Sequence, residues 1–180
     1  MIHHSKESLR ERFKKVRSEI PKYRREWARV DLKTTLKNNF SKYGLTLSYS
    51  SFNSELETDL ANEYLLKKGK LALPKVINDE IEVFQVYCLK SQLKISSFGM
   101  MEPDENLCKK IAIENVQLAL IAGTCFDSSF HRVGYGKGHY DKLLSRLGCP
   151  IIGIGYKEQY FSERIPVEPH DKQLDCLSLF

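Results

Sequence analysis

The sequence predicts an α/β protein of three layers, α/β/α, with helices on both faces of a largely parallel central sheet. Short apolar runs alternate with helical patterns along the chain, which is typical of parallel strands joined by crossover helices. Residues 116–122 are apolar except for Gln117 and have the length of a buried strand. A glycine-rich segment and a helical pattern follow them, so this region predicts strand, loop and helix in succession.

Two helices are expected at the N-terminal end. Residues 5–20 carry apolar side chains at helical spacing, and three basic side chains fall on one line beside them: Lys6, Arg10 and Arg17. From the edge of a buried face, such long side chains can reach into a cleft. A second helix follows Pro21, which suits a first helical position, and extends to about Phe40. The residues expected on its buried face are Trp27, Val30 and Thr34.

The middle of the chain predicts short strands and two helices. Strands are expected at residues 45–49, 71–74 and 81–87, and the last of these is expected to pair with residues 89–95. One helix should begin at Glu55 and end before Gly69, and another should cover about 105–112. Pro74 is expected to stop the second strand, and residues 96–104 are expected to form a loop.

The C-terminal part predicts one helix and two strands. Apolar residues recur at helical spacing from Tyr140 to Leu147, and Gly148 with Pro150 supplies a stop. Strands are expected at residues 149–155 and 174–179, with an irregular segment between them. Because ligands of such sheets bind at the carboxyl ends of the strands, three loops are candidates for binding. They are the loops after Tyr49, Ala122 and Gly155.

Composition favours one globular domain covering residues 1–180. The hydrophobic share of 42% and the charged share of 28% are ordinary, and the length is sufficient for a core. No apolar run approaches the ~20 residues that span a bilayer, and the first residues lack a signal-peptide core, so we expect a cytoplasmic protein without membrane contact. The five cysteines are scattered, which favours buried free thiols over disulfides or a zinc site.

The net charge of +5 is concentrated at the N-terminal end. Residues 1–40 hold 12 Lys and Arg against 5 Asp and Glu, whereas the rest hold 16 against 18. This surplus could meet nucleic acid, a small anion or only solvent. Because no aromatic residues interleave with the charge to form a basic face, we expect no nucleic-acid partner.

The segment 132–141 carries most of the recognisable chemistry. Three glycines alternate within it, and glycine lets the backbone turn sharply and bring N–H groups close to a ligand. The following helix start adds free N–H groups, which suits phosphate, although a simple tight turn remains an alternative. Lys137 would add a mobile charge and Arg132 a planar one. The spacing matches neither the P-loop nor the dinucleotide-binding fingerprint.

Further motifs accompany this segment in a fixed order. They are Lys6-x-x-Leu9-Arg10, Glu55-Leu56-Glu57-Thr58, Gly69-Lys70 with Leu73-Pro74, Glu102-Pro103, Phe126-Asp127 and Pro166-x-x-x-His170-Asp171. Each is weak alone, but the ordered set spans nearly the whole chain. Together they resemble the 5-formyltetrahydrofolate cyclo-ligase family, also called methenyltetrahydrofolate synthetases.

The resemblance implies a fold of the sugar-phosphate isomerase/CoA-transferase-like type and a reaction that depends on ATP and Mg²⁺. In that reaction ATP phosphorylates the formyl oxygen of 5-formyltetrahydrofolate, the neighbouring nitrogen closes the ring, and loss of phosphate gives 5,10-methenyltetrahydrofolate. The partner is then a reduced folate, and we expect a monomer. The alternative is a diverged relative that binds folate or nucleotide without turning it over.

The resemblance also assigns roles to residues. Lys137 and Arg132 would be catalytic, and Asp141 and Asp171 would hold Mg²⁺, for which hard carboxylate oxygens are suited. The expected ATP-binding residues are Lys6, Glu7, Ser8, Leu9, Arg10, Arg132, Val133, Gly134, Tyr135, Gly136, Lys137, Gly138, His139 and Tyr140. The expected folate-binding residues are Arg10, Ser50, Glu55, Phe98, Tyr135, Gly136, Lys137, Gly138 and His139.

Structural readings of the same residues stay open. Asp141 could favour the dipole of its helix, Asp171 could pair on the surface, and Glu55 could simply begin a helix. Phe98 could belong to the core rather than pack on the folate ring.

Four positions depart from the family pattern. Ala122 replaces a proline, Phe98 a tryptophan and His139 a tyrosine. Phe130 stands where glycine is usual, and because a bulky residue disfavours positive φ, the loop before Arg132 could be reshaped. These departures bear on rate and substrate detail more than on nucleotide binding.

Overall fold

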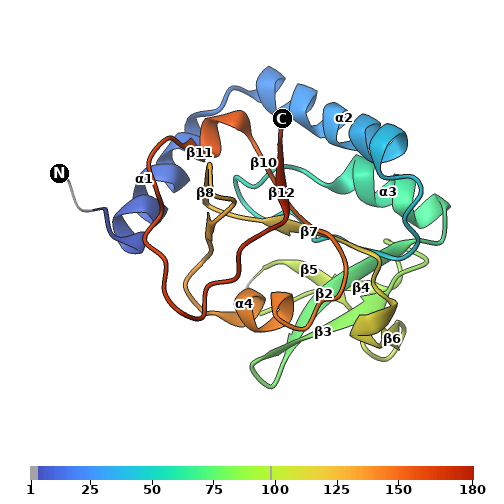
Figure 1. The fold of residues 1–180 in the computed structure, drawn as a ribbon. Helices are drawn as coiled ribbons and strands as arrows, with labels where there is room; N and C mark the ends of the chain where they lie inside the picture. The colour runs from blue at the N-terminus through green and yellow to red at the C-terminus, as the bar shows by residue number, and fades with distance from the viewer. Residues whose placement is uncertain (1–3, 98) are drawn as a thin grey trace.

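The computed structural model describes residues 4–97 and 99–180, and its centre is a seven-stranded sheet (Figure 1). The four strand pairs from β12 to β2 are parallel, and the last two pairs are antiparallel. The predicted largely parallel sheet is therefore confirmed. In sheet order the strands are β12 (Cys176–Leu179), β10 (Ile151–Gly155), β7 (Leu118–Ala122), β1 (Thr46–Leu47), β2 (Leu71–Ile77), β3 (Glu80–Gln85) and β6 (Lys109–Ile111).

Helices cover both faces of this sheet, as predicted. Figure 1 shows α2 (Lys22–Asn39) and α3 (Asp59–Lys67) on one side of it and α4 (His139–Leu144) on the other. Successive side chains of a strand point to opposite faces, so β7 supplies both cores. Leu118 and Leu120 pack with α2 and α3, whereas Ala119 and Ile121 pack with α4. Short 3-10 helices, η1 (Ile113–Asn115) and η2 (Lys157–Gln159), lie between strands.

A third core anchors the first helix, α1 (Lys6–Glu19), to a small three-stranded sheet. That sheet consists of β8 (Cys125–Asp127), β9 (Arg132–Val133) and β11 (Tyr160–Phe161). Leu9 and Phe13 of α1 pack against Val133 and Phe161. Because β9 leads directly into the glycine-rich segment, this packing places the basic line of α1 beside that segment.

The predicted buried face of α2 is wrong. Trp27 is 65% exposed and packs edge-on against Tyr23, with ring centroids 5.5 Å apart, while Val30 and Thr34 are also exposed. The face that packs on the sheet has apolar residues spaced four apart: Ala28, Leu32 and Leu36. Helical spacing allows either stripe, and the small side chain of Ala28 is the one that fits against the sheet.

Two element boundaries differ from expectation near the first strands. The helix expected from Glu55 begins at Asp59, because Thr58 donates a hydrogen bond to the Tyr49 carbonyl at 2.7 Å and keeps the preceding residues in a loop. Strand β2 continues through Pro74. The backbone of Ala72 forms its hydrogen bond on the side of β2 that faces β1. The backbone of Pro74, two residues further along, faces the same side, but β1 has already ended there. The missing N–H of proline therefore leaves no hydrogen bond of the sheet unmade.

The pairing expected for residues 81–87 is also wrong. A tight turn at Asn78 and Asp79, both at positive φ, pairs β3 with β2, and β6 takes its other edge. Residues 105–112, expected to be helical, contain β6 instead. The segment 89–95 pairs through β4 (Leu93–Ile95) with β5 (Met101–Pro103), which lies in the expected loop.

The five cysteines are free thiols, as predicted, but only Cys108 and Cys125 are buried, whereas Cys149 and Cys176 are half-buried and Cys88 is exposed. Among the helices of the described part of the chain, none is both long enough and apolar enough to cross a bilayer.

The turn between β8 and β9 contains a residue other than glycine in the left-handed backbone conformation. Phe130 has a φ of 61°. Asp127 fixes this turn, since its Oδ1 accepts hydrogen bonds from the N–H groups of Ser129 and His131, each at 2.9 Å. The Phe130 carbonyl also accepts a hydrogen bond from Leu174 at 3.0 Å. The neighbours therefore hold a conformation that is unfavourable by about 1–2 kcal/mol for a residue with a Cβ atom.

Replacing Phe130 should reveal this strain. The variants Phe130→Gly and Phe130→Ala both lose the ring, but only glycine loses the Cβ atom. We expect Phe130→Gly to be more stable than Phe130→Ala by about 1 kcal/mol in urea denaturation. Equal stability of the two variants would show that the turn is not strained.

Candidate active site

A cavity of about 280 Å³ opens between α1, the glycine-rich segment and the hairpin of β2 and β3. Ala122 and Ser50 line it at the carboxyl ends of β7 and β1. The irregular segment after Gly155 contributes residues of its distal part, 168–171, so all three candidate loops contribute, as predicted. Chain segments far apart in sequence therefore meet around one space.

Most of the residues predicted to bind ATP or folate line this cavity. They are Lys6, Arg10, Ser50, Glu55, Arg132, Gly134, Tyr135, Gly136, Lys137, Gly138, His139 and Tyr140, together with the predicted metal ligands Asp141 and Asp171. Four predicted ATP contacts are not among its described lining residues. Leu9 and Val133 are buried in a core, Ser8 forms a capping box with Ser5, and Glu7 is exposed. Phe98 lies outside the described residues.

Arg132 is a buried cation at one end of the cavity. It is 8% exposed, and its Nη2 lies 3.1 Å from Oδ1 of Asp141. Burial lowers the pKa of Arg132, and the charge of Asp141 opposes that shift. Its Nε has no hydrogen-bond partner among residues 4–97 and 99–180. A buried donor left unpaired is unfavourable unless a ligand satisfies it, so this atom fits an anion in the cavity.

The glycines beside Arg132 are needed for close approach and for backbone conformation. A Cβ atom on Gly134 would lie 2.6 Å from Nη1 of Arg132. Gly136 and Gly138 have φ of 97° and 70°, which favour glycine. Arg10 donates a hydrogen bond from Nε to the Gly134 carbonyl at 2.7 Å, so α1 also holds the segment. Because α4 has only six residues, we assign most of the positive charge here to side chains rather than to the helix dipole.

The two predicted metal ligands lie at this same end. The backbone N–H of Lys172 is 3.5 Å from Oδ1 of Asp141, which brings Asp171 close to Asp141. The Lys6 ammonium lies 2.7 Å from Oδ1 of Asp171 and 2.6 Å from Glu168. Burial alone would raise the pKa of Asp171, but the hydrogen bonds from Lys6 and from the Glu168 N–H hold it below its ordinary value. A side-chain cation thus already occupies a position where carboxylate oxygens could hold Mg²⁺.

A buried carboxylate, Glu55, lies between the two ends of the cavity. It is 7% exposed, and its oxygens accept hydrogen bonds from the Tyr135 hydroxyl at 2.7 Å and the Phe52 N–H at 2.9 Å. Burial raises the pKa of Glu55, and these hydrogen bonds, with the charge of Arg17, oppose the shift. Burial and the negative charge of Glu55 raise the pKa of Tyr135 to about 12, so this hydroxyl stays a donor at neutral pH.

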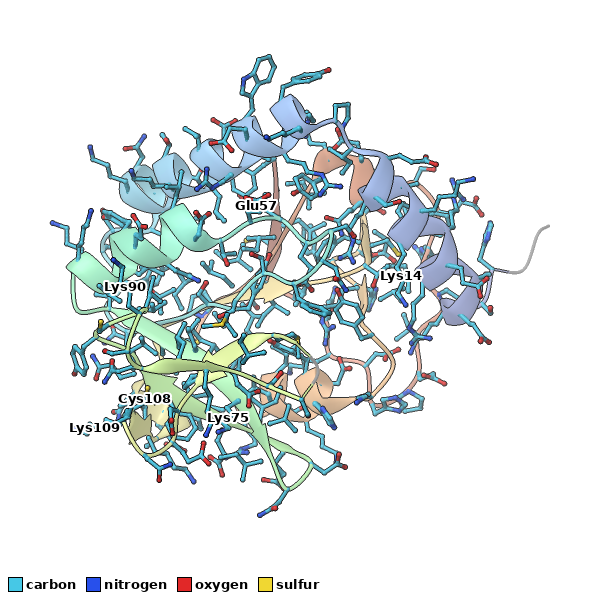
Figure 2. The ribbon with its side chains drawn as sticks, turned by 180° about the vertical axis from the view of Figure 1, so that it is seen from behind. Lys14, Glu57, Lys75, Lys90, Cys108 and Lys109 are labelled. Carbon is cyan, nitrogen blue, oxygen red and sulfur yellow. The ribbon has the colours of Figure 1, made fainter. Side chains whose placement is uncertain are left out.

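The far end of the cavity was missed by sequence reasoning. Its lining is mainly apolar and comes from β2, β3 and the segment around β5: Pro74, Val76, Ile81, Met100 and Met101. Lys75 is 7% exposed there, pairs with Glu105 and lies 4.0 Å from Glu102. Figure 2 shows Lys75 among these strands, away from Lys14 on α1. Two sequence signals pointed to this end, the Leu73-Pro74 motif that directly precedes Lys75 and the Glu102-Pro103 motif.

His139 closes one wall of the cavity. Its Nε2 lies 2.8 Å from Oδ1 of Asp79, on the turn between β2 and β3. His139 therefore links the glycine-rich segment to the apolar end, in addition to its predicted contact with ligand.

The raised pKa of Glu55 predicts a pH-dependent stability. A carboxyl group whose folded pKa lies above its ordinary value of 4.5 favours folding when protonated. That contribution is present at low pH and is lost as pH rises through the folded pKa. We expect Glu55→Gln to gain in Tm relative to the unsubstituted protein between about pH 4 and about pH 8. A Tm difference that is constant over this range would contradict the raised pKa.

Comparison with known proteins shows the family of this chain. A model of the 5-formyltetrahydrofolate cyclo-ligase family matches residues 2–179. A probable 5-formyltetrahydrofolate cyclo-ligase of Schizosaccharomyces pombe is 31% identical over 138 residues, 68% of each chain. The NMR structure of a 5,10-methenyltetrahydrofolate synthetase from Aquifex aeolicus has a TM-score of 0.85 at 30% identity and covers 96% of this chain and 88% of its own. A Mycoplasma pneumoniae synthetase, at 23% identity and a TM-score of 0.75 over 97% of this chain and 98% of its own, shares the fold. This chain belongs to the 5-formyltetrahydrofolate cyclo-ligase family.

Proposed function

We propose that this protein converts 5-formyltetrahydrofolate to 5,10-methenyltetrahydrofolate in a reaction that depends on ATP and Mg²⁺ and releases ADP and phosphate. The observation that carries the proposal is the composition of one cavity. A cluster of cations and two carboxylates occupy one end, a buried carboxylate lies in the middle, and an apolar wall forms the other end. The cations match phosphate, the two carboxylates match a metal ion, and the buried carboxylate together with the apolar wall matches a flat heterocycle.

The cationic end would hold the phosphates of ATP. Lys6, Arg10, Arg132 and Lys137 supply positive charge, and the loop of Gly134, Gly136 and Gly138 lets backbone N–H groups approach. Phosphoryl transfer needs such charge neutralisation and alignment more than covalent catalysis. We assign the catalytic roles to Lys137 and Arg132, because both can offset the charge that develops as the γ-phosphoryl group moves. The unpaired Nε of Arg132 gains a partner when a phosphate oxygen binds.

The reaction proceeds in two bond-making steps in this proposal. The formyl oxygen attacks the γ-phosphorus, an O–P bond forms, and the bond from phosphorus to the ADP oxygen breaks. The neighbouring nitrogen in the side chain of the folate itself then attacks the formyl carbon and loses its proton. The C–O bond breaks, and the former formyl oxygen leaves in inorganic phosphate. The role of this chain in both steps is to align the reactants and exclude competing water.

Mg²⁺ would be held by Asp141 and Asp171 together with phosphate oxygens. Hard oxygen ligands of this kind suit the ion, and bound Mg²⁺ supplies charge neutralisation at the phosphates. The Lys6 ammonium between Asp171 and Glu168 supports this placement, since that position already stabilises a cation. The ligand atoms of Glu168, His170 and Asp171 lie within 4.8 Å of one another, so this segment can also accommodate a cation.

The folate would extend from the centre to the apolar end. A carboxylate such as Glu55 can accept hydrogen bonds from the amide and amino edge of a pterin, and Ser50 lies beside it in the wall. Val76, Ile81 and Met100 would pack against the rings. The same proposal includes a single domain over residues 1–180 that acts as a monomer in the cytoplasm, without nucleic-acid or membrane partners.

An absorbance assay tests this function. Purified protein, 5-formyltetrahydrofolate, Mg²⁺ and ATP should produce the methenyltetrahydrofolate band, and omission of ATP or chelation of Mg²⁺ should abolish it. A flat trace from folded protein that still binds 5-formyltetrahydrofolate would instead indicate a diverged binding protein. That result would assign a functional effect to the departures at Phe130 and His139.

Replacement of Lys137 tests the phosphate-binding role of the glycine-rich segment. We expect Lys137→Ala to lower kcat/KM for ATP by about 10²–10³-fold, the loss typical when one group that stabilises transition-state charge is removed. Because this side chain is exposed, Tm should change little. Lys142→Ala is the matched control, since Lys142 is exposed on α4 and is not among the described lining residues. Equal kinetics of the two variants would remove the phosphate-binding role.

A further inference from the structure

Two hydrogen bonds connect α1 to Glu55 through the glycine-rich segment. Arg17 donates from Nη2 to the Tyr135 hydroxyl at 3.2 Å, and that hydroxyl donates to Oε1 of Glu55 at 2.7 Å. The three residues come from three separate parts of the chain. Arg17 is not among the described residues that line the cavity, so any effect on a ligand must pass through Tyr135 or through the charge on Glu55.

Arg17 is poorly suited to a purely structural role. It is 2% exposed, its Nη1 lies 3.4 Å from the Gly123 carbonyl, and its Nε lacks a hydrogen-bond partner within the described residues. Burying a charge with incomplete partners is unfavourable, and an apolar side chain of similar volume often stabilises such a position as well or better. A buried cation that donates a hydrogen bond to a residue lining the site therefore indicates a functional demand.

We propose that Arg17 is a positioning residue of the folate site, which directs the Tyr135 hydroxyl to Glu55 and places a buried positive charge at the start of this chain of hydrogen bonds. The consequence for catalysis rests on the proposed function, because it requires Glu55 to bind the substrate. The consequence for the titration of Glu55 itself does not depend on the proposed function.

The surroundings of Glu55 make Arg17 important to its charge. The titratable groups that face this carboxylate are the hydroxyls of Tyr49, Tyr135 and Tyr140 and the guanidinium of Arg17, while the Phe52 N–H bonds it directly. The phenols are neutral at neutral pH, so Arg17 supplies the positive charge in this set. Burial raises the pKa of Glu55, and the Arg17 charge lowers it. Loss of Arg17 must therefore raise this pKa further.

Lys14 provides a matched control for the loss of charge. The Lys14 ammonium and the Arg17 guanidinium both lie 5.9 Å from the centroid of the Tyr135 ring. Lys14 is exposed on α1 (Figure 2), and the bond to the Tyr135 hydroxyl comes from Arg17. The variants Arg17→Gln and Lys14→Gln thus each remove one positive charge from the same helix beside the same ring, and Arg17→Lys restores the charge at the buried position.

The first measurement is the pH titration of the Glu55 carboxyl carbon by NMR, with the signal assigned from its loss in Glu55→Gln. We expect Arg17→Gln to move the midpoint upward by about one pH unit, the shift typical of removing a close opposite charge, while Lys14→Gln leaves it in place and Arg17→Lys restores most of it. Identical midpoints in Arg17→Gln and the unsubstituted protein would overturn the proposal, whether or not the protein turns over folate.

The second measurement separates folate from nucleotide. At pH values on the acid side of the Glu55 titration, Arg17→Gln should raise KM for 5-formyltetrahydrofolate about tenfold, as expected when the midpoint of that titration moves by about one pH unit. KM for ATP should stay unchanged. Adding Tyr135→Phe to Arg17→Gln should then change the folate KM little further, because both substitutions break the same chain of hydrogen bonds to Glu55. A lower Tm with unchanged folate KM and pH profile would mark Arg17 as structural. Absence of turnover in the unsubstituted protein would reject the proposed function, while the NMR titration would still decide the role of Arg17.

Discussion

The buried contact between Arg132 and Asp141 is the constraint on which the rest of the site depends. Arg132 begins β9 in the small sheet beside α1, and Asp141 lies in the first turn of α4, so the contact closes the glycine-rich segment into a loop. Gly134 must lack a side chain because the guanidinium occupies that space. Removing a guanidinium from water is unfavourable by several kcal/mol, and contact with one carboxylate does not fully offset it, since Nε of Arg132 has no hydrogen-bond partner within the described residues. The loop is therefore preorganised for an additional anion.

Helix α1 joins this loop to the other parts of the cavity. Three of its side chains, one turn or two apart, each contact a different segment: Lys6 reaches Asp171, Arg10 reaches the Gly134 carbonyl, and Arg17 reaches Tyr135. Part of the N-terminal excess of positive charge is thus directed toward the cavity. A single helix therefore contacts three separate segments that line the cavity.

Local patterns predicted the central fold well, and tertiary context accounts for the errors. The apolar runs of β7 and β10 and the glycine-rich loop were identified because their own residues determine them. The buried face of α2 was not, since two stripes compete and only contact with the sheet selects Ala28 over Trp27. The basic line of α1 indicated a cleft, but the partner of Arg17 could not be predicted, because Tyr135 is more than a hundred residues away. Lys75 likewise gains its place from strand pairing that the sequence did not reveal.

The central claim is that the phosphoryl group moves to the formyl oxygen and leaves with it. Turnover of 5-formyltetrahydrofolate labelled with ¹⁸O in the formyl group tests this most directly, with the released phosphate analysed by mass spectrometry or ³¹P NMR. We expect one ¹⁸O atom in the phosphate for each methenyltetrahydrofolate formed, in unlabelled water. Unlabelled phosphate, with methenyltetrahydrofolate still produced, would contradict phosphorylation of the formyl oxygen.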